Sequence, residues 1–255
     1  KYFRYELNIP DEQFLPGSWQ KLRGGENLES VYWLYNRTGE SWLLELAKKI
    51  YRQTADWTSP ILTTERDRLW EESSFYHGVN IAMGLKYPAL YYKQTKKKQL
   101  LEAVERNYQQ LMTAYGQQPG GMFAADENIR PGYNDPRQGA ETCTMVEMMF
   151  TWETLLKITG ETIAADRVED IAFNSLPASM TPDLRGLHYL TAANLISCDR
   201  SGEHDFQNSG TLLSYDPWSY RCCQHNVAFG WPYLAEHLWL ATADQGVAAV
   251  IYAPS

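Results

Sequence analysis

One pattern recurs along the chain and limits the folds open to it. Apolar residues at helical spacing, interrupted by a short polar break, fill three stretches: 27–57, 74–115 and 144–180. The breaks contain the sequences NRTGE, KQTKK and KITGE. Their threonines, here called the break threonines, are Thr38, Thr95 and Thr159, which lie 57 and 64 residues apart. This spacing indicates a repeated pair of helices, each of about 12–20 residues, joined by a short loop.

Helical hairpins of this length bury their apolar stripes only by stacking on one another. We therefore expect an all-α fold, arranged as an open solenoid or a closed ring. The loop 116–139 is long and rich in Gly, Pro and Asp, and such loops at one end of a helical ring suggest the rim of an active site. The tail 245–255 contains VAAVIY, which is typical of a β-strand. We predict a helical domain over 1–243 and the start of a β domain over 244–255.

The charge pattern argues against some classes of partner. The net charge is −8, and the one basic run, KQTKKKQ at 93–99, lies between predicted helices, where a solvated helix end is expected. This balance argues against nucleic acid and anionic membranes. No stretch approaches the roughly 20 apolar residues of a membrane-spanning helix. The chain begins without Met and without a signal-like apolar segment, which predicts a processed or truncated product.

Two of the four cysteines, Cys222 and Cys223, are adjacent, while Cys143 and Cys198 stand alone. Adjacent cysteines bond to each other poorly, because the short loop strains the disulfide. Four cysteines in a chain of 255 residues also do not resemble a disulfide framework. The adjacent pair therefore points to another use for two sulfurs.

A glutamate and a third cysteine precede a predicted helix. Thr144 and Glu147 fit a capping box, so we predict that this helix begins near residue 144. Glu141 and Cys143 then lie two residues apart in extended chain, with both side chains on one side. Together with the cysteine pair, which precedes a second predicted helix, they offer three thiolates and one carboxylate, an acceptable set for tetrahedral Zn²⁺. Buried reduced cysteines that act as small apolar residues are the alternative.

Several segments together resemble glycoside hydrolase family 127, the β-L-arabinofuranosidase group. The resemblance covers most of the chain and rests on the hairpin repeat and on four segments: FYHGVN (75–80), ADENIRPGYNDPRQGAETC (125–143), HYLTAAN (188–194) and RCCQHN (221–226). It implies a six-hairpin (α/α) toroid followed by β-sandwich domains, with this chain holding a part that is truncated at the N-terminus. It also implies a retaining exo-glycosidase that releases terminal β-L-arabinofuranose or a related sugar from plant or bacterial glycans.

The resemblance implies roles for single residues as well. The cofactor would be Zn²⁺, and its ligands would be Glu141, Cys143, Cys222 and Cys223. Cys222 would be the nucleophile, because the thiolate is the reactive form and Zn²⁺ with helix N-termini favours it near neutral pH. Attack on the anomeric carbon would give a thioglycoside that water resolves, in place of the usual pair of carboxylates.

The resemblance also implies an acid/base and two substrate contacts. Glu127 corresponds to the acid/base glutamate of the family, with its neighbour Asp126 as the alternative. His77 corresponds to a histidine that contacts the sugar, and Tyr189 to a tyrosine that contacts the substrate. The other histidines have no secure counterpart in the family: His188, His204, His225 and His237.

The chain departs from the family at two places. The segment RGGENLES (23–30) lacks a further sugar-contacting histidine, and QHN replaces the prolines that often follow the cysteine pair, so the sugar stays open. Two other functions stay open: an (α/α)-toroid hydrolase or lyase that works through Asp126, Glu127 and histidines, and a non-catalytic glycan-binding module stapled by zinc. Glycan degradation favours a periplasmic or secreted location by analogy. The sequence does not indicate an oligomeric state.

Overall fold

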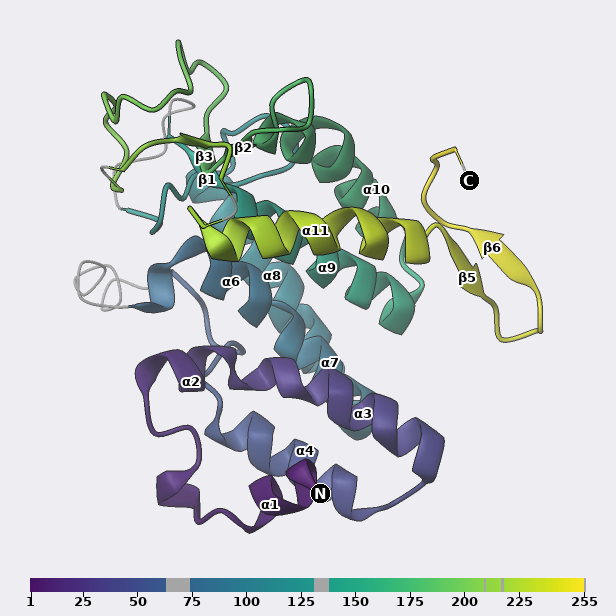
Figure 1. The fold of residues 1–255 in the computed structure, drawn as a ribbon. Helices are drawn as coiled ribbons and strands as arrows, with labels where there is room; N and C mark the ends of the chain where they lie inside the picture. The colour runs from purple at the N-terminus through teal and green to yellow at the C-terminus, as the bar shows by residue number, and fades with distance from the viewer. Residues whose placement is uncertain (63–73, 131–137, 209, 217, 255) are drawn as a thin grey trace. The chain divides into compact units, whose positions relative to one another are not determined.

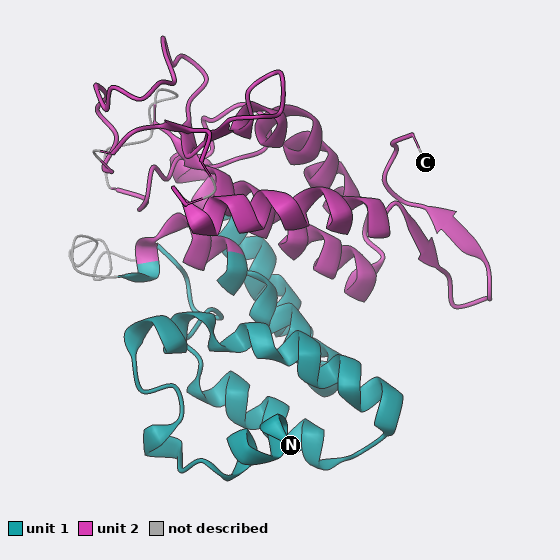
Figure 2. Ribbon diagram, viewed as in Figure 1, with its two compact units in different colours: residues 1–75, 83–110 teal, residues 76–82, 111–255 magenta. Residues whose placement is uncertain are grey.

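The computed structural model describes residues 1–62, 74–130, 138–208, 210–216 and 218–254 (Figure 1). The chain is mostly helical, as predicted, and its strands are short. It divides into two compact units, coloured separately in Figure 2: residues 1–75 with 83–110, and residues 76–82 with 111–255. No helix in the described part of the chain is long and apolar enough to cross a bilayer.

The first unit is made of helices that bury aliphatic faces. Its helices are α1 (Tyr2–Asn8), α2 (Ser18–Arg23), α3 (Asn27–Thr38), α4 (Trp42–Gln53), α7 (Lys86–Thr95), the end of α6 (Gly78–Gly84) and the first part of α8 (Gln99–Tyr115). Short 3₁₀ turns occupy Asp11–Gln13, Gly24–Glu26 and Ser74–Tyr76. Helices α3 and α4 pack on each other and on α7. Their contact faces bury Val31, Leu46, Ile50 and Leu90, none more than 1% exposed.

At each of the three predicted breaks a helix ends with the same hydrogen-bond pattern. Helices α3, α7 and α9 (Thr142–Thr159) each end at a break threonine. Its hydroxyl donates to the carbonyl four residues earlier, at 2.9, 3.3 and 2.9 Å in chain order. It also accepts the N–H two residues later, at 3.4, 3.4 and 3.2 Å. The next residue, Gly39, Lys96 or Gly160, is left-handed, with φ of 69°, 57° and 72°, as is common at the C-terminal end of a helix.

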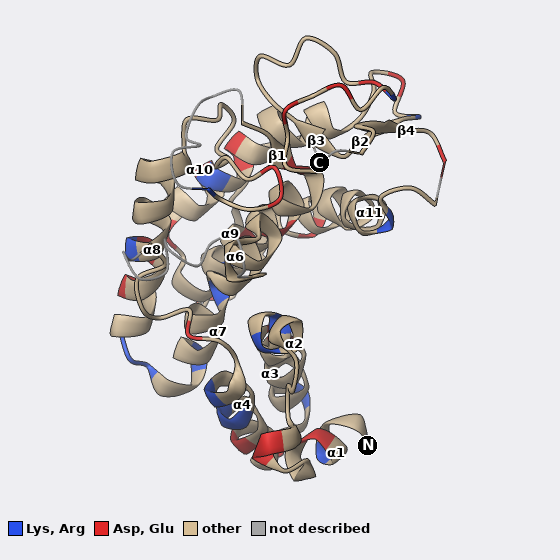
Figure 3. Ribbon diagram, turned by 90° about the vertical axis from the view of Figure 1, so that its left-hand side faces the viewer, with Lys and Arg blue, Asp and Glu red and all other residues tan. Residues whose placement is uncertain are grey.

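The basic run 93–99 forms the end of α7 and the turn into α8, and its residues 96–99 are exposed. Figure 3 shows Lys and Arg on several separate elements, α4 among them. The run is thus a solvated helix end, as predicted.

The second unit is organised around α9. This helix packs against α10 (Thr162–Asp170) and α11 (Arg221–Glu236). Helix α10 continues into a five-residue π-helix, Ile171–Ser175, and then a 3₁₀ turn, Leu176–Ser179. The apolar face predicted for α9 is core, and its members are 3% exposed or less: Met145, Met148, Met149, Trp152 and Leu156.

Short antiparallel ladders bring the loops of this unit together. The pairs are β1 (Ala140–Glu141) with β3 (Leu190–Thr191), β2 (Leu187–His188) with β4 (Leu213–Ser214), and β5 (Trp239–Ala241) with β6 (Val247–Ala249). Strand β6 lies in the segment VAAVIY, where a strand was predicted. The predicted domain boundary at 243/244 falls in the turn between β5 and β6, and the division into domains stays a prediction.

Two helices begin earlier than predicted. Helix α9 begins at Thr142, two residues before the position predicted from Thr144; its N-cap is Glu141 and no side chain caps it, so the predicted capping box is wrong. Helix α11 begins at Arg221 and includes the cysteine pair, because Tyr220 turns the chain into the helix with a left-handed φ of 51°. Cys143 therefore lies in the first turn of α9 and not in extended chain, and the cysteine pair lies in the first turn of α11 and not before the helix.

Candidate metal centre and catalytic site

Three cysteines and one glutamate meet in the second unit. The ligand atoms of Glu141, Cys143, Cys222 and Cys223 all lie within 4.8 Å of one another. The sulfurs of Cys143 and Cys223 are 3.1 Å apart, and those of Cys222 and Cys223 are 4.0 Å apart. Cys223 Sγ lies 3.5 Å from Glu141 Oε1. We call these four residues the Cys–Glu cluster.

Helix packing assembles this cluster. Glu141 ends β1 immediately before α9, Cys143 lies in the first turn of α9, and the adjacent cysteines lie in the first turn of α11. Helices α9 and α11 approach closely at Gly230, where an added Cβ would lie 3.1 Å from Val146 Cγ2. The first turns of both helices carry partial positive charge, which favours thiolates there.

The three thiols of the cluster are not equivalent. Cys143 and Cys223 are buried, whereas Cys222 is exposed, and all are free of disulfides. Hydrogen bonds from Cys143 and then Cys223 hold the pKa of Cys222 well below its usual value. The hydrogen bond to Cys222 is the largest cause that raises the pKa of Cys143. The exposed sulfur is therefore the one whose thiolate form these contacts favour.

The carboxylate of the cluster, Glu141, also has an environment that favours a bound cation. Glu141 is 2% exposed, and within the described residues its Oε2 makes no hydrogen bond. Burial raises the pKa of Glu141 to about 7, against the opposing effect of His77. A buried carboxylate beside a thiolate is stabilised by a positive charge bound between them. These four residues are therefore able to hold a metal ion.

Glu127 lies beside this cluster, in a second group with His77 and Glu141. His77 Nε2 is 3.1 Å from Glu127 Oε2 and 3.7 Å from Glu141 Oε2. The Tyr189 hydroxyl and, at 3.1 Å, the Asn208 amide both donate to Glu127 Oε1. Burial acts to raise the pKa of Glu127, but the hydrogen bonds from His77, Tyr189 and Asn208 outweigh it and hold the pKa below its usual value.

The neighbouring acid has different partners. Both oxygens of Asp126 accept hydrogen bonds from Arg130 Nη2 at 2.7 Å, and Asp126 Oδ2 also accepts the Gln207 N–H at 2.8 Å. Asp126 is thus engaged in holding two loops together. The backbone of Glu127 has a φ of 153°, a region that non-glycine residues seldom occupy and that is found at functional sites.

Two residues at the site escaped the sequence analysis. Asn208, 81 residues from Glu127, also lies 3.3 Å from the Tyr189 hydroxyl. Tyr220 stacks on Tyr189 with ring centroids 4.6 Å apart and planes 5° apart. No motif marks Asn208. Tyr220 had one signal, because it directly precedes the segment that contains the cysteine pair.

The remaining histidines lie in other surroundings. Three of them contact backbone carbonyls through a ring nitrogen, at 2.6–2.7 Å: His188 with Ala178, His204 with Gly210 and His237 with Tyr233. His225 is exposed on α11. Residues 131–137 of the segment 125–143 lie outside the described residues.

A family model matches most of the chain. The model of the β-L-arabinofuranosidase GH127 catalytic domain covers residues 1–236. No curated protein sequence matches the chain.

Solved glycosidase structures share its fold. A GH127 β-L-arabinofuranosidase from Geobacillus stearothermophilus T6 matches with a TM-score of 0.67 at 15% identity, over 88% of this chain and 39% of that chain. A glycoside hydrolase matches with a TM-score of 0.61 at 17% identity, over 89% of this chain and 40% of that chain. A GH127 β-arabinofuranosidase matches with a TM-score of 0.56 at 16% identity, over 83% of this chain and 32% of that chain. The chain therefore spans 40% or less of the length of these structures.

Proposed function

The chain belongs to the β-L-arabinofuranosidase GH127 catalytic domain family, and from this we propose that it works as a retaining exo-glycosidase with Cys222 as nucleophile and Zn²⁺ as cofactor. The substrate class of the family is carbohydrate. The proposed product is terminal β-L-arabinofuranose or a related sugar, released from a plant or bacterial glycan. One observation carries the proposal: an exposed cysteine, Cys222, and a hydrogen-bonded glutamate, Glu127, lie against the same buried carboxylate, Glu141.

The Cys–Glu cluster is the proposed zinc site. Three sulfurs and one carboxylate oxygen make up the four donors of a tetrahedral centre. Bound Zn²⁺ would supply positive charge that keeps the thiols ionised at neutral pH. The ligands would be Glu141, Cys143, Cys222 and Cys223.

The first chemical step breaks the glycosidic bond. The Cys222 thiolate attacks the anomeric carbon, and the bond from that carbon to the leaving oxygen breaks. Protonated Glu127 donates its proton to the leaving oxygen, so the aglycone departs as an alcohol. The hydrogen bonds that hold the pKa of Glu127 below its usual value make this protonated form the minor one before substrate binds. The product on the protein is a thioglycoside of Cys222 with inverted anomeric configuration.

The second step frees the sugar. Water attacks the anomeric carbon while Glu127 accepts its proton, and the carbon–sulfur bond breaks to restore the Cys222 thiolate. Two inversions give net retention. The hydrogen bonds from Tyr189 and Asn208 favour the ionised form of Glu127 that this step requires. We propose His77 and Tyr189 as contacts to sugar hydroxyls.

The fold has a proposed place in a larger architecture. The helical hairpins would form part of a six-hairpin (α/α) toroid over residues 1–243. Strand β6 would belong to the start of a β domain that begins at 244, and its partner β5 lies just before that boundary. The structures that the chain matches are more than twice its length, so the activity of the whole enzyme is part of the proposal.

Hydrolysis of aryl furanosides and pectic oligosaccharides, with zinc present and after chelation, tests this function. We expect about one zinc per chain, dependence of hydrolysis on zinc, and an initial product with the anomeric configuration of the substrate by NMR. Cys222→Ser should abolish hydrolysis. Cys198→Ser is the matched control, since Cys198 lies outside the Cys–Glu cluster, and it should retain full activity.

Other outcomes point to other functions. Full activity of Cys222→Ser would indicate a hydrolase or lyase that works through carboxylates and histidines. Bound zinc and bound glycan without turnover of any substrate would indicate a non-catalytic module. Either result contradicts the proposed mechanism.

A further inference from the structure

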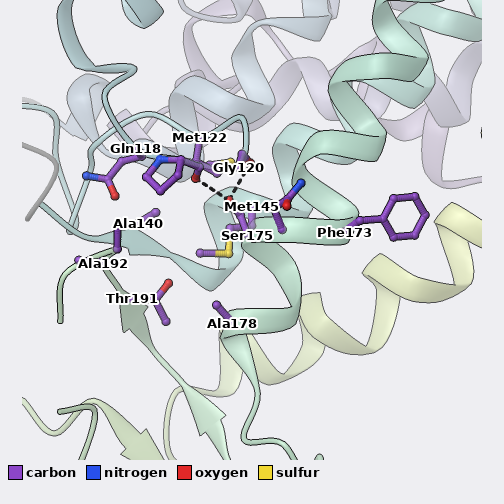
Figure 4. Close-up of a pocket in the computed structure, with 13 residues that line it drawn as sticks. Gln118, Gly120, Met122, Ala140, Met145, Phe173, Ser175, Ala178, Thr191 and Ala192 are labelled. Carbon is purple, nitrogen blue, oxygen red and sulfur yellow. Dashed lines mark hydrogen bonds between the residues drawn. The ribbon is translucent and has the colours of Figure 1, made fainter. Parts of the chain in front are cut away.

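The second unit contains a pocket that the proposed mechanism does not use. Its volume is about 470 Å³, and its walls come from the loop after α8, the strands β1 and β3, helix α9 and the π-helix Ile171–Ser175 (Figure 4). None of the four residues of the Cys–Glu cluster lines it, and neither do His77, Glu127 and Tyr189. Pockets of roughly 300–1,000 Å³ are the usual size of small-ligand sites. We call it the π-helix pocket.

The chemistry of its walls is neutral throughout. Among the residues that the structure describes, none that lines the pocket carries a charged side chain. Gln118, Asn174, Ser175 and Thr191 contribute amides and hydroxyls, while Met122 and Met145 contribute thioether and methylene surface. This mixture suits an uncharged ligand that has both hydroxyl groups and an apolar face. A sugar ring is such a ligand, whereas a carboxylate or phosphate would lose its hydration without a charged partner.

The backbone of the loop that contains Gly120 and Gly121 lies very close to the π-helix. Gly120 and Gly121 both adopt left-handed φ angles, 79° and 76°. A Cβ on Gly120 would lie 2.5 Å from Ser175 Oγ. The Ser175 hydroxyl instead donates to the Gly120 carbonyl at 2.7 Å and contacts the Pro119 carbonyl at 3.3 Å. The loop with Gly120 and Gly121 therefore packs against the last residue of the π-helix, Ser175.

The π-helix is a second, independent pointer to a ligand. It supplies Phe173, Asn174 and Ser175 to the lining. π-Helical turns are rare and are frequently found at functional sites. Figure 4 shows the Phe173 ring pointing away from the other labelled residues. The Asn174 amide donates to the Asp170 carbonyl at 2.8 Å and to its carboxylate at 3.2 Å, which fixes this side chain at the pocket wall.

The pocket lies behind the ladder that carries Glu141. Ala140 on β1 and Thr191 on β3 are cross-strand partners, and both line the pocket. The next pair along the ladder is Glu141 with Leu190. Because successive strand residues point to opposite faces, Glu141 reaches the Cys–Glu cluster from the face opposite to the pocket.

We propose that the π-helix pocket is a second carbohydrate subsite, which binds one neutral sugar residue without cleaving it. Only the choice of carbohydrate as the ligand rests on the proposed function. The pocket, its neutral lining and its π-helix do not depend on zinc or on catalysis.

Methionine methyl NMR tests the subsite without turnover. The chain has seven methionines. Met122 and Met145 line the pocket. Met148 and Met149 are buried in α9, the helix that carries Met145, but they do not line the pocket. Titration of zinc-free protein with L-arabinose or D-galactose should shift the Met122 and Met145 methyls saturably and leave the other two in place. D-Galacturonate should bind at least about tenfold more weakly, because the described lining residues include no cation.

Matched variants locate the binding. Ala178→Trp fills the pocket from an exposed position and should abolish the shifts, while Ala241→Trp, exposed on β5, should leave them unchanged. Unchanged Met148 and Met149 signals show that a variant is folded. If Ala178→Trp is not folded, Ala192→Leu is the alternative variant that fills the pocket.

Three results would overturn the proposal. These are an absence of shifts at Met122 and Met145 with every neutral sugar, shifts that persist in the filled variants, and equal binding of the uronate. Cys222→Ser should bind the sugars like the parent protein. The subsite and the catalytic proposal therefore fail separately.

Discussion

At the scale of single residues, two neighbouring acids have separate environments. Asp126 is 1% exposed and held by Arg130 and the Gln207 backbone. Glu127 turns its carboxylate to His77 and Tyr189, beside the Cys–Glu cluster. The loop sequence alone did not separate the two, because their side chains differ by one methylene and both lie in the same segment.

This difference predicts opposite outcomes for two substitutions. Glu127→Gln should slow cleavage of an alkyl or sugar leaving group by about 10²–10⁴-fold, because proton transfer to the leaving oxygen is lost. A 4-nitrophenyl leaving group needs little protonation, so its departure should slow far less. Asp126→Asn should keep the leaving-group dependence of the parent protein and lower the free energy of unfolding by about 3 kcal/mol, because a buried ion pair is broken.

Leaving-group series in single-turnover kinetics, with urea unfolding of both variants, measure these effects. Equal rate losses on both kinds of leaving group in Glu127→Gln would contradict its role as the acid. A leaving-group effect confined to Asp126→Asn would transfer that role to Asp126.

Glu141 predicts how the stability of the metal-free protein depends on pH. Burial raises its pKa to about 7 in the folded protein, from 4.5 for an exposed glutamate. Between these values the folded state binds the proton more tightly than the unfolded state does, so the free energy of unfolding falls as the pH rises. The full contribution is about 3 kcal/mol.

The difference between parent protein and Glu141→Gln isolates this effect. Urea unfolding of chelated protein at pH 5 and pH 7.5 should show a loss in the parent that exceeds the loss in Glu141→Gln by about 2 kcal/mol, because this window covers most of the titration. The difference cancels the contributions of other carboxylates. The same pH trend in both proteins would show that Glu141 keeps an ordinary pKa.

At the scale of secondary-structure elements, the helix ends follow local chemistry in some places and packing in others. The ends at the break threonines were predictable, since a threonine followed by a residue in the left-handed conformation stops a helix by contacts within one turn. The start of α9 was not predictable from its capping pattern. Thr144 is fully buried, so the helix begins where β1 pairs with β3 and not at the residue that resembles a cap.

The turn geometry predicts the effects of alanine at equivalent positions. Gly39 and Gly160 have left-handed φ angles, and an added Cβ meets nothing within 4 Å. Gly39→Ala and Gly160→Ala should each lower the free energy of unfolding by about 1 kcal/mol, from backbone strain alone. Lys96→Ala is the matched control, because Lys96 already places a Cβ at this position with a φ of 57°.

Urea unfolding measures all three variants. We expect Lys96→Ala to change the free energy of unfolding by less than half as much as either glycine variant. Equal losses at the three positions would show that strain from an added Cβ is not the cause of the loss in the glycine variants.

At the scale of the whole molecule, the candidate site belongs to one of the two compact units. All residues of the Cys–Glu cluster, together with His77, Glu127, Tyr189 and Asn208, come from residues 76–82 and 111–255. His77 reaches this unit through a short segment between two longer segments of the first unit. No sequence pattern marks that interruption, because division into compact units depends on contacts between distant segments.

The sequence by itself determined the helical pairs, their breaks and the kinds of donor near the metal centre. These are local properties, since helical periodicity, turn chemistry and residue type act within a few residues. Only the tertiary structure decided which atoms meet. It brought Asn208 to Glu127, stacked Tyr220 on Tyr189, placed the cysteines in first helical turns, and formed a neutral pocket behind Glu141. Each of these results is a contact between segments far apart in the chain, and packing decides such contacts.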